Sequence, residues 1–165
     1  RAGARPWALG FRLCDDRGTS QVLHRMKYGG LAGPAKRLGR WMAATWPGPP
    51  SDTVLVPVPS HWRRRLRRGF NPAESLARGL SHTWGCSVEP SLLVRAGHRR
   101  SLTGSSRAER MRVLQACYVA QPGETPRNVV LVDDVLTTGA TYRTCAQALA
   151  AEGHICLGGV WLALA

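Results

Sequence analysis

NVVLVDDVLTTGAT, residues 128–141, is the most informative stretch of this sequence. Its first part, residues 129–132, is a continuous β-branched and aliphatic run, which is typical of a strand covered on both faces within a parallel sheet. Two adjacent carboxylates, Asp133 and Asp134, follow at the expected carboxyl end of that strand. Small and hydroxyl-bearing residues come next, and a helical pattern begins after Thr141. The order is therefore strand, acids, small-residue loop and helix.

This order is suited to binding a sugar phosphate. A helix amino terminus after a tight loop offers free backbone N–H groups and the positive end of a dipole, and both favour phosphate. Gly139 lets the backbone approach a ligand closely. Carboxylates beside such a loop would repel a phosphate, unless they accept hydrogen bonds from sugar hydroxyls or hold a metal that the ligand already carries. Ribose attached to a phosphate satisfies both conditions.

Other interpretations of this stretch are weaker. It is not a P-loop, because GxxxxGK(S/T) is absent, and it is not GxGxxG either. An ordinary strand end with a solvated pair of aspartates is the simplest alternative. The acids, their spacing and the start of the helix all agree with a ligand site instead.

Length, composition and charge limit the possible classes of protein and of partner. With 165 residues, 44% of them hydrophobic, we expect a single domain with a real core. No stretch approaches the roughly 20 apolar residues that span a bilayer. The five cysteines are odd in number and form no CxxC, which argues against a zinc site or a disulfide framework and favours a reducing, cytoplasmic setting. The net charge of +13 favours polyanionic partners, although a coding bias toward arginine would have the same effect.

Strands are predicted to alternate with helices, which indicates an α/β fold with a parallel sheet. The expected strands are residues 7–13, 53–58, 88–94, 116–119, 129–132 and 155–164, the last with a bulge at its two glycines. The expected helices are residues 19–29, 31–46, 71–84, 106–114 and 142–152. Asn71, Pro72 and Glu74 predict a capping box at the start of the third of these helices. In parallel sheets ligands bind outside the carboxyl ends of the strands, so the segments after residues 58 and 132 are expected to lie side by side.

A dense arginine cluster follows the strand at 53–58. Five arginines occupy six positions in residues 63–68, which cannot form a packed core. They are a solvated face, a polyphosphate clamp or a nucleic-acid patch. Trp62, which lies next to these arginines, is the tryptophan that is a candidate for stacking on a base. Residues 95–104 form a second basic segment without periodicity, expected to be a surface loop that can cover the site.

The stretch 128–141 resembles the phosphoribosyl pyrophosphate (PRPP) motif of type I phosphoribosyltransferases. Three further segments resemble one branch of them, the ComF/GntX family of competence protein F-like proteins: LHRMKYGG at 23–30, VPVP through RGFN at 56–71, and SRAER at 106–110. The chain departs from that family in lacking its four-cysteine zinc ribbon. It also has Leu102 and Val113 where Gln and Asn are usual.

The resemblance implies roles for particular residues and a central, mostly parallel sheet flanked by helices. Asp133 and Asp134 would face the ribose hydroxyls and help to hold Mg²⁺, together with water or ligand oxygens. The 5-phosphate loop would be Thr137, Thr138, Gly139, Ala140 and Thr141. The pyrophosphate segment would be Pro59, Ser60, His61 and Arg63. Arg99 and Arg100 would belong to the flexible loop, and Lys27 would be a further phosphate contact.

Two functions are compatible with these features. The first is an enzyme that binds PRPP, or a ribose-5-phosphate-type ligand, with Mg²⁺ and transfers phosphoribosyl to a nucleobase or similar nitrogen nucleophile. The second is a non-catalytic competence protein that uses the fold to bind single-stranded DNA or a DNA-uptake helicase. In both, residues 1–165 are one domain, with residues 1–50 as a small hood and 51–165 as the PRPP-binding core. Oligomers are possible.

Overall fold

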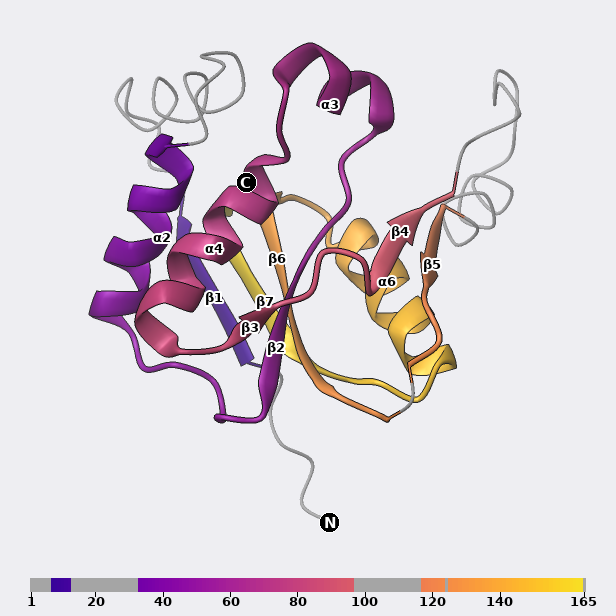
Figure 1. Cartoon of the computed structure of the whole chain (residues 1–165). Helices are drawn as coiled ribbons and strands as arrows, with labels where there is room; N and C mark the ends of the chain where they lie inside the picture. Colours follow the sequence, from indigo (N-terminus) through magenta and orange to yellow (C-terminus); the bar gives the residue numbers. More distant parts are fainter. Residues whose placement is uncertain (1–6, 13–32, 97–116, 124, 165) are drawn as a thin grey trace.

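The centre of the fold is a parallel β-sheet of five strands. The computed structural model describes residues 7–12, 33–96, 117–123 and 125–164. The strand order is β1-β7-β6-β2-β3, and every neighbouring pair is parallel (Figure 1). The strands are β1 Trp7–Arg12, β2 Thr53–Pro57, β3 Ser87–Val88, β6 Asn128–Leu136 and β7 Ile155–Leu164. The predicted α/β class with a parallel sheet is therefore confirmed.

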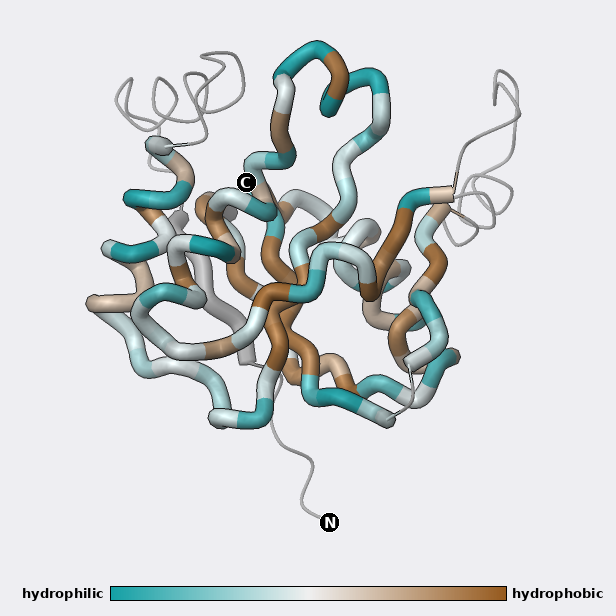
Figure 2. Tube along the Cα trace, in the orientation of Figure 1, coloured by the Kyte–Doolittle hydropathy of each residue, from teal (hydrophilic) through white to brown (hydrophobic). Residues whose placement is uncertain are grey.

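Two layers cover this sheet, one on each face. Helices α2 Gly33–Thr45 and α4 Pro72–Trp84 lie on one face, and helix α6 Ala140–Ala151 lies on the other (Figure 1). A separate antiparallel ribbon, β4 Leu93–Arg95 with β5 Tyr118–Ala120, lies beside α6. Figure 2 shows the hydrophobic colouring concentrated along the central strands between these layers.

Side chains alternate between the two cores along the central strands, as a pleated strand requires. Val130 and Val132 of β6 pack in the core shared with α2 and α4. Val129 and Leu131 pack in the core shared with α6 and the ribbon. All four are at most 1% exposed, which confirms the expectation of a strand covered on both faces.

Strand β6 runs further than the sequence predicted. Its pairing with β7 continues through Asp133, opposite Trp161, to Leu136, opposite Leu164. The expectation that the strand ends before the acids was wrong, because the long partner strand β7 continues to supply hydrogen bonds. The predicted bulge is confirmed: Val129 and Val130 face Cys156 and Gly158, so one extra residue lies in β7.

Helices α2 and α4 cross closely through two glycines. A Cβ added at Gly39 would lie 3.0 Å from the Cα of Gly79, so a side chain at either position would force the helices apart. This contact orients α2 so that Met42 is fully buried while Trp41 is 54% exposed. Trp41 therefore lies on the exposed side of α2.

The segment 88–94 is not a single strand. Ser87–Val88 joins the main sheet next to β2, whereas Leu93–Arg95 pairs antiparallel with β5. Pro90 lies between the two pieces, and a proline cannot donate a hydrogen bond to a sheet ladder. The chain turns there and leaves the sheet, with Leu92 N donating to Glu89 O at 3.3 Å.

The ladder between β2 and β6 continues to the end of β2. Pro57 lies opposite Val132, and Val58 N donates to Val132 O at 2.8 Å. The predicted helices at 19–29 and 106–114 lie outside the described residues, as do the resembling segments at 23–30 and 106–110. None of the helices within the described residues is both long enough and apolar enough to cross a membrane.

Candidate functional site

A cavity of about 220 Å³ lies at the carboxyl ends of β2 and β6. These strands are direct neighbours, with Pro57 opposite Val132, so the segments that follow them converge. The cavity is lined by Val58, Pro59, Ser60, His61, Arg64, Arg68, Asn71, Pro72, Ala73, Arg95, Tyr118, Asp133, Asp134, Val135 and Thr141. The prediction that the two segments lie side by side is confirmed. We call this space the acid cavity.

Both predicted acids line the acid cavity. Asp133 and Asp134 are half-buried on β6, and Asp133 Oδ1 accepts a hydrogen bond from Asp134 N at 2.9 Å. Consecutive residues of a strand point to opposite faces of the sheet. Both carboxylates can therefore line one cavity only at the edge of the sheet, near the end of the covered part of β6. The pair thus presents acceptor oxygens to a ligand at the rim of the sheet.

The predicted phosphate loop connects β6 to α6. Gly139 has a φ of 71°, in the left-handed region that favours glycine, and helix α6 begins at the next residue. Thr138 Oγ1 accepts from Ala140 N at 3.4 Å. Thr141 lines the acid cavity, while Thr137, Gly139 and Ala140 line a small hollow next to it together with Asp133. The amino terminus of a twelve-residue helix therefore adjoins the acids, as the sequence indicated.

The arginine cluster is a helix, which the sequence did not predict. Helix α3 spans Trp62–Arg68 and has no buried residue. His61 caps its amino terminus, since His61 Nδ1 accepts from Arg63 N at 3.2 Å, and Gly69 ends it with a φ of 78°. Figure 1 shows α3 projecting away from the sheet and the other helices.

The helical turn determines which arginines face the acid cavity. Arg64 and Arg68 are one turn apart and both line it. Arg63, the predicted pyrophosphate contact, is not among the lining residues, and its guanidinium lies 5.2 Å from the centre of the Trp62 ring. Pro59, Ser60 and His61 do form part of the wall. Lys27, Arg99 and Arg100 lie outside the described residues.

Arg95 and Tyr118 are lining residues that the sequence analysis missed. They are paired across the β4–β5 ribbon, and Arg95 Nη1 donates to Tyr118 Oη at 3.4 Å. Burial raises the pKa of Tyr118 to about 12, with Arg95 opposing the shift and the Cys145 and Asp133 charges adding to it. The phenol is therefore a neutral hydrogen-bonding group at physiological pH. No signal in the sequence identified Tyr118, whereas Arg95 is the first cation of the basic segment 95–104.

The donor set at the acid cavity fits one mode of Mg²⁺ binding. Within the described residues no three His, Cys, Asp or Glu side chains gather as a metal site. The two carboxylates alone cannot enclose an ion. They suit Mg²⁺ that is held mainly by ligand oxygens and water, with one or two carboxylates completing the octahedron.

Known proteins resemble this chain over most of its length. The chain is 31% identical over 140 residues to DNA utilization protein YhgH of Salmonella typhi, covering 81% of this chain and 62% of that protein. It is 32% identical over 99 residues to competence protein F of Haemophilus influenzae, covering 58% and 43%. The chain is therefore similar to competence protein F-like proteins. No protein-family model matches the chain, which spans about 62% of the length of the first of these relatives.

A solved structure supports the fold of this chain. The allosteric regulatory enzyme of purine biosynthesis matches 78% of this chain and 25% of its own chain, with a TM-score of 0.53 and 22% identity. The likeness concerns the fold alone, and it agrees with the type I phosphoribosyltransferase fold that the acid stretch indicated.

Proposed function

We propose that this chain binds PRPP, or a ribose-5-phosphate-type ligand, with Mg²⁺ in the acid cavity and transfers the phosphoribosyl group to a nitrogen nucleophile. One observation carries the proposal. The acid cavity brings two adjacent carboxylates and Thr141, in the first turn of α6, together with the cations of Arg64, Arg68 and Arg95. A ligand with a sugar between two phosphate groups matches this order of acceptors and donors.

Each part of the ligand has a partner of suitable chemistry. Asp133 and Asp134 would accept hydrogen bonds from the ribose hydroxyls. The residues 137–141 would bind the 5-phosphate through backbone N–H groups and threonine hydroxyls. Arg64, Arg68 and Arg95 would bind the pyrophosphate, a role that the sequence assigned to Arg63.

The reaction needs no protein nucleophile. The bond between the anomeric carbon and the pyrophosphate oxygen breaks, a carbon–nitrogen bond forms, and the proton lost by the nitrogen passes to the departing pyrophosphate or to solvent. Mg²⁺ would neutralise charge on the pyrophosphate. The chain itself would contribute orientation of the ribose by the two carboxylates and neutralisation of the leaving group by the arginines.

Calorimetric titration of PRPP with Mg²⁺ tests this proposal. We expect saturable binding that needs Mg²⁺ and is lost when Asp133→Asn is combined with Asp134→Asn. Glu152→Gln is the control, because this exposed carboxylate lies at the opposite end of α6 and its loss also adds one positive unit to the net charge. Binding that survives in the double variant, or that only fades with salt in all three proteins, would contradict the proposed site.

A second candidate is a nucleic-acid-binding protein without catalysis. The specific observation is α3, which carries five arginines together with Trp62, 56% exposed, and Leu66, 75% exposed. The relatives' names, DNA utilization protein and competence protein, agree with such a role. The two acid-to-amide changes distinguish the candidates. They would abolish phosphoribosyl transfer but leave binding of single-stranded DNA unchanged or stronger, because they remove negative charge.

A further inference from the structure

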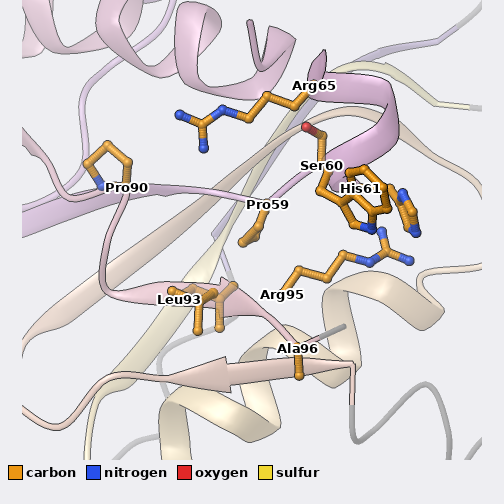
Figure 3. A pocket seen from close by; sticks show the side chains of 10 residues that line it. Pro59, Ser60, His61, Arg65, Pro90, Leu93, Arg95 and Ala96 are labelled. Atoms are coloured by element: carbon orange, nitrogen blue, oxygen red, sulfur yellow. The ribbon is translucent and has the colours of Figure 1, made fainter. Parts of the chain in front are cut away.

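A second cavity adjoins the acid cavity, on the other side of the segment after β2. Its volume is about 270 Å³. It is lined by Pro59, Ser60, His61, Trp62, Arg65, Pro90, Leu93, Val94, Arg95 and Ala96 (Figure 3). Pro59, Ser60, His61 and Arg95 also line the acid cavity, so these residues form a shared wall. We call this space the outer cavity.

The lining of the outer cavity combines apolar surface with cations. Pro90 and Leu93 are part of its apolar wall. Figure 3 shows Arg65 reaching in from α3 on one side and Arg95 from β4 on the other. No acidic side chain is among the described residues that line this cavity. A ligand that matches it has a flat apolar part and negative charge on two sides.

An aromatic pair stands at the edge of the outer cavity. The rings of His61 and Trp62 are stacked, with centroids 5.9 Å apart and an interplanar angle of 25°. The Trp62 side chain remains 56% exposed, although burial of its ring against the fold would be favourable. Exposed aromatic rings beside arginines are the usual platform for unpaired bases, because every base has a flat face to stack.

The charge of α3 continues beyond this cavity. Arg65 lines the outer cavity, Arg64 and Arg68 line the acid cavity, and Arg67 lines neither. A free mononucleotide would need only Arg65, whereas a polynucleotide backbone can contact cations along the whole of α3. Bases in a duplex are stacked and paired, and moving one out of the duplex costs free energy. Only a single strand can place a base in the cavity without that cost.

We propose that the outer cavity holds one base of single-stranded DNA, with Arg65 and Arg95 contacting the phosphates on either side of that base. This inference rests on the second candidate function and gives it a defined site. The base lies against Pro90 and Leu93 and stacks on Trp62. The arginines on the remaining faces of α3 contribute charge without contacting the base.

A comparison of two arginine variants distinguishes a specific binding site from non-specific electrostatic attraction of DNA. Anisotropy of fluorescein-labelled oligothymidine would be measured over a range of salt concentrations. Arg65→Ala and Arg67→Ala remove the same charge from the same helix. We expect Arg65→Ala to weaken binding about tenfold more than Arg67→Ala, because the loss of a phosphate contact next to a held base also releases the base. Equal losses for the two variants would mean that α3 acts only through its charge, which would overturn the inference.

A charge-neutral pair of variants provides an independent test. Val94 lines the outer cavity and is 37% exposed. Ile155 is 58% exposed at the start of β7, opposite Asn128 and away from the cavity. Val94→Trp fills the cavity, whereas Ile155→Trp places the same bulk at the other end of the sheet. We expect about tenfold weaker binding for Val94→Trp and little change for Ile155→Trp, with unchanged circular dichroism for both. Unchanged binding by Val94→Trp would overturn the inference.

The aromatic contact is tested in the same way. Trp62→Ala is expected to weaken binding about tenfold, within the range known for loss of one stacking ring. Trp41→Ala is the control, because Trp41 is comparably exposed on α2, away from the cavity. A wild-type protein that fails to bind oligothymidine would refute both the second candidate function and this site. Binding that none of the cavity variants weakens would refute the site alone.

Discussion

Replacing Gly79 by alanine should force α2 and α4 apart and destabilise the protein. A Cβ at this position would overlap the carbonyl oxygen of Lys36 and would lie 2.9 Å from the Cα of Gly39. Both obstacles are backbone, so no side-chain rotation can relieve them. The helices would have to separate, and the fully buried Met42 and Leu80 would lose contacts with their neighbours.

The magnitude follows from two opposing terms. Overpacking in a close-packed core costs about 1–3 kcal/mol, and the upper part of this range, about 2–3 kcal/mol, applies here because both obstacles are backbone atoms. Alanine is about 1 kcal/mol better than glycine inside a helix. The net loss is then about 1–2 kcal/mol, which corresponds to a fall in Tm of roughly 2–8 °C for a chain of this size. Gly39→Ala should behave similarly, and the double variant should lose less than the sum, because the first change already separates the helices.

Urea unfolding followed by circular dichroism measures this effect. Gly33→Ala is the matched control, since it changes glycine to alanine in α2 at a position where the new Cβ meets nothing within 4 Å. It should alter stability by less than about 0.5 kcal/mol. If Gly79→Ala unfolded at the same or a higher urea concentration than the wild type, the close crossing of α2 and α4 would be refuted.

Three further predictions concern the cap of α4, two tyrosines and a cysteine. Asn71→Ala removes the acceptor for Ala73 N and the donor to Val58 O, so it should cost about 1–2 kcal/mol in urea unfolding, whereas Asn71→Asp should cost less because it keeps the cap; equal losses would contradict this. The pKa values of Tyr118 and Tyr142 are raised by burial from 10.0 to about 12. Because the unfolded chain releases these protons first, stability should be unaffected by them below pH 10 and should fall as the pH rises toward about 12; a spectroscopic titration in which both ionise near pH 10 would disprove it. Cys145 is fully buried, and burial together with the Asp133 charge raises its pKa, so mass spectrometry should find it unmodified by iodoacetamide until the protein is unfolded.

The sequence determined the sheet and the acid half of the site well. Residues 129–132 could only be a strand covered on both faces, and the adjacent acids and Gly139 placed a ligand loop at its end. These are local signals: hydrophobic continuity, a pair of charges and a glycine before a helix. The start of α4 was equally readable from Asn71 and Pro72, although Glu74 binds Arg78 at 2.8 Å in the structure, where the sequence predicted that it completes the capping box.

The cationic half of the site was harder to predict because it depends on contacts between distant segments. The direction in which each arginine of residues 63–68 points follows from the geometry of helix α3. The sequence did not indicate this helix, because the run has no apolar periodicity. The lining residues Arg95 and Tyr118 come from a ribbon whose strands are separated by more than 20 residues. Their nearness to Asp133 is a property of the packed fold, which local patterns do not encode.

Helix α3 has no buried residue. A helix of seven residues has little stability of its own in water, so its backbone amides should exchange with deuterium far faster than those of α4, which is packed against the core. Occupation of either neighbouring cavity would order α3, and its exchange would then slow while that of α4 stayed the same. The rate of hydrogen exchange in α3 should therefore report ligand binding. Substitutions in α3 can change the affinity for a ligand with little effect on the stability of the rest of the molecule.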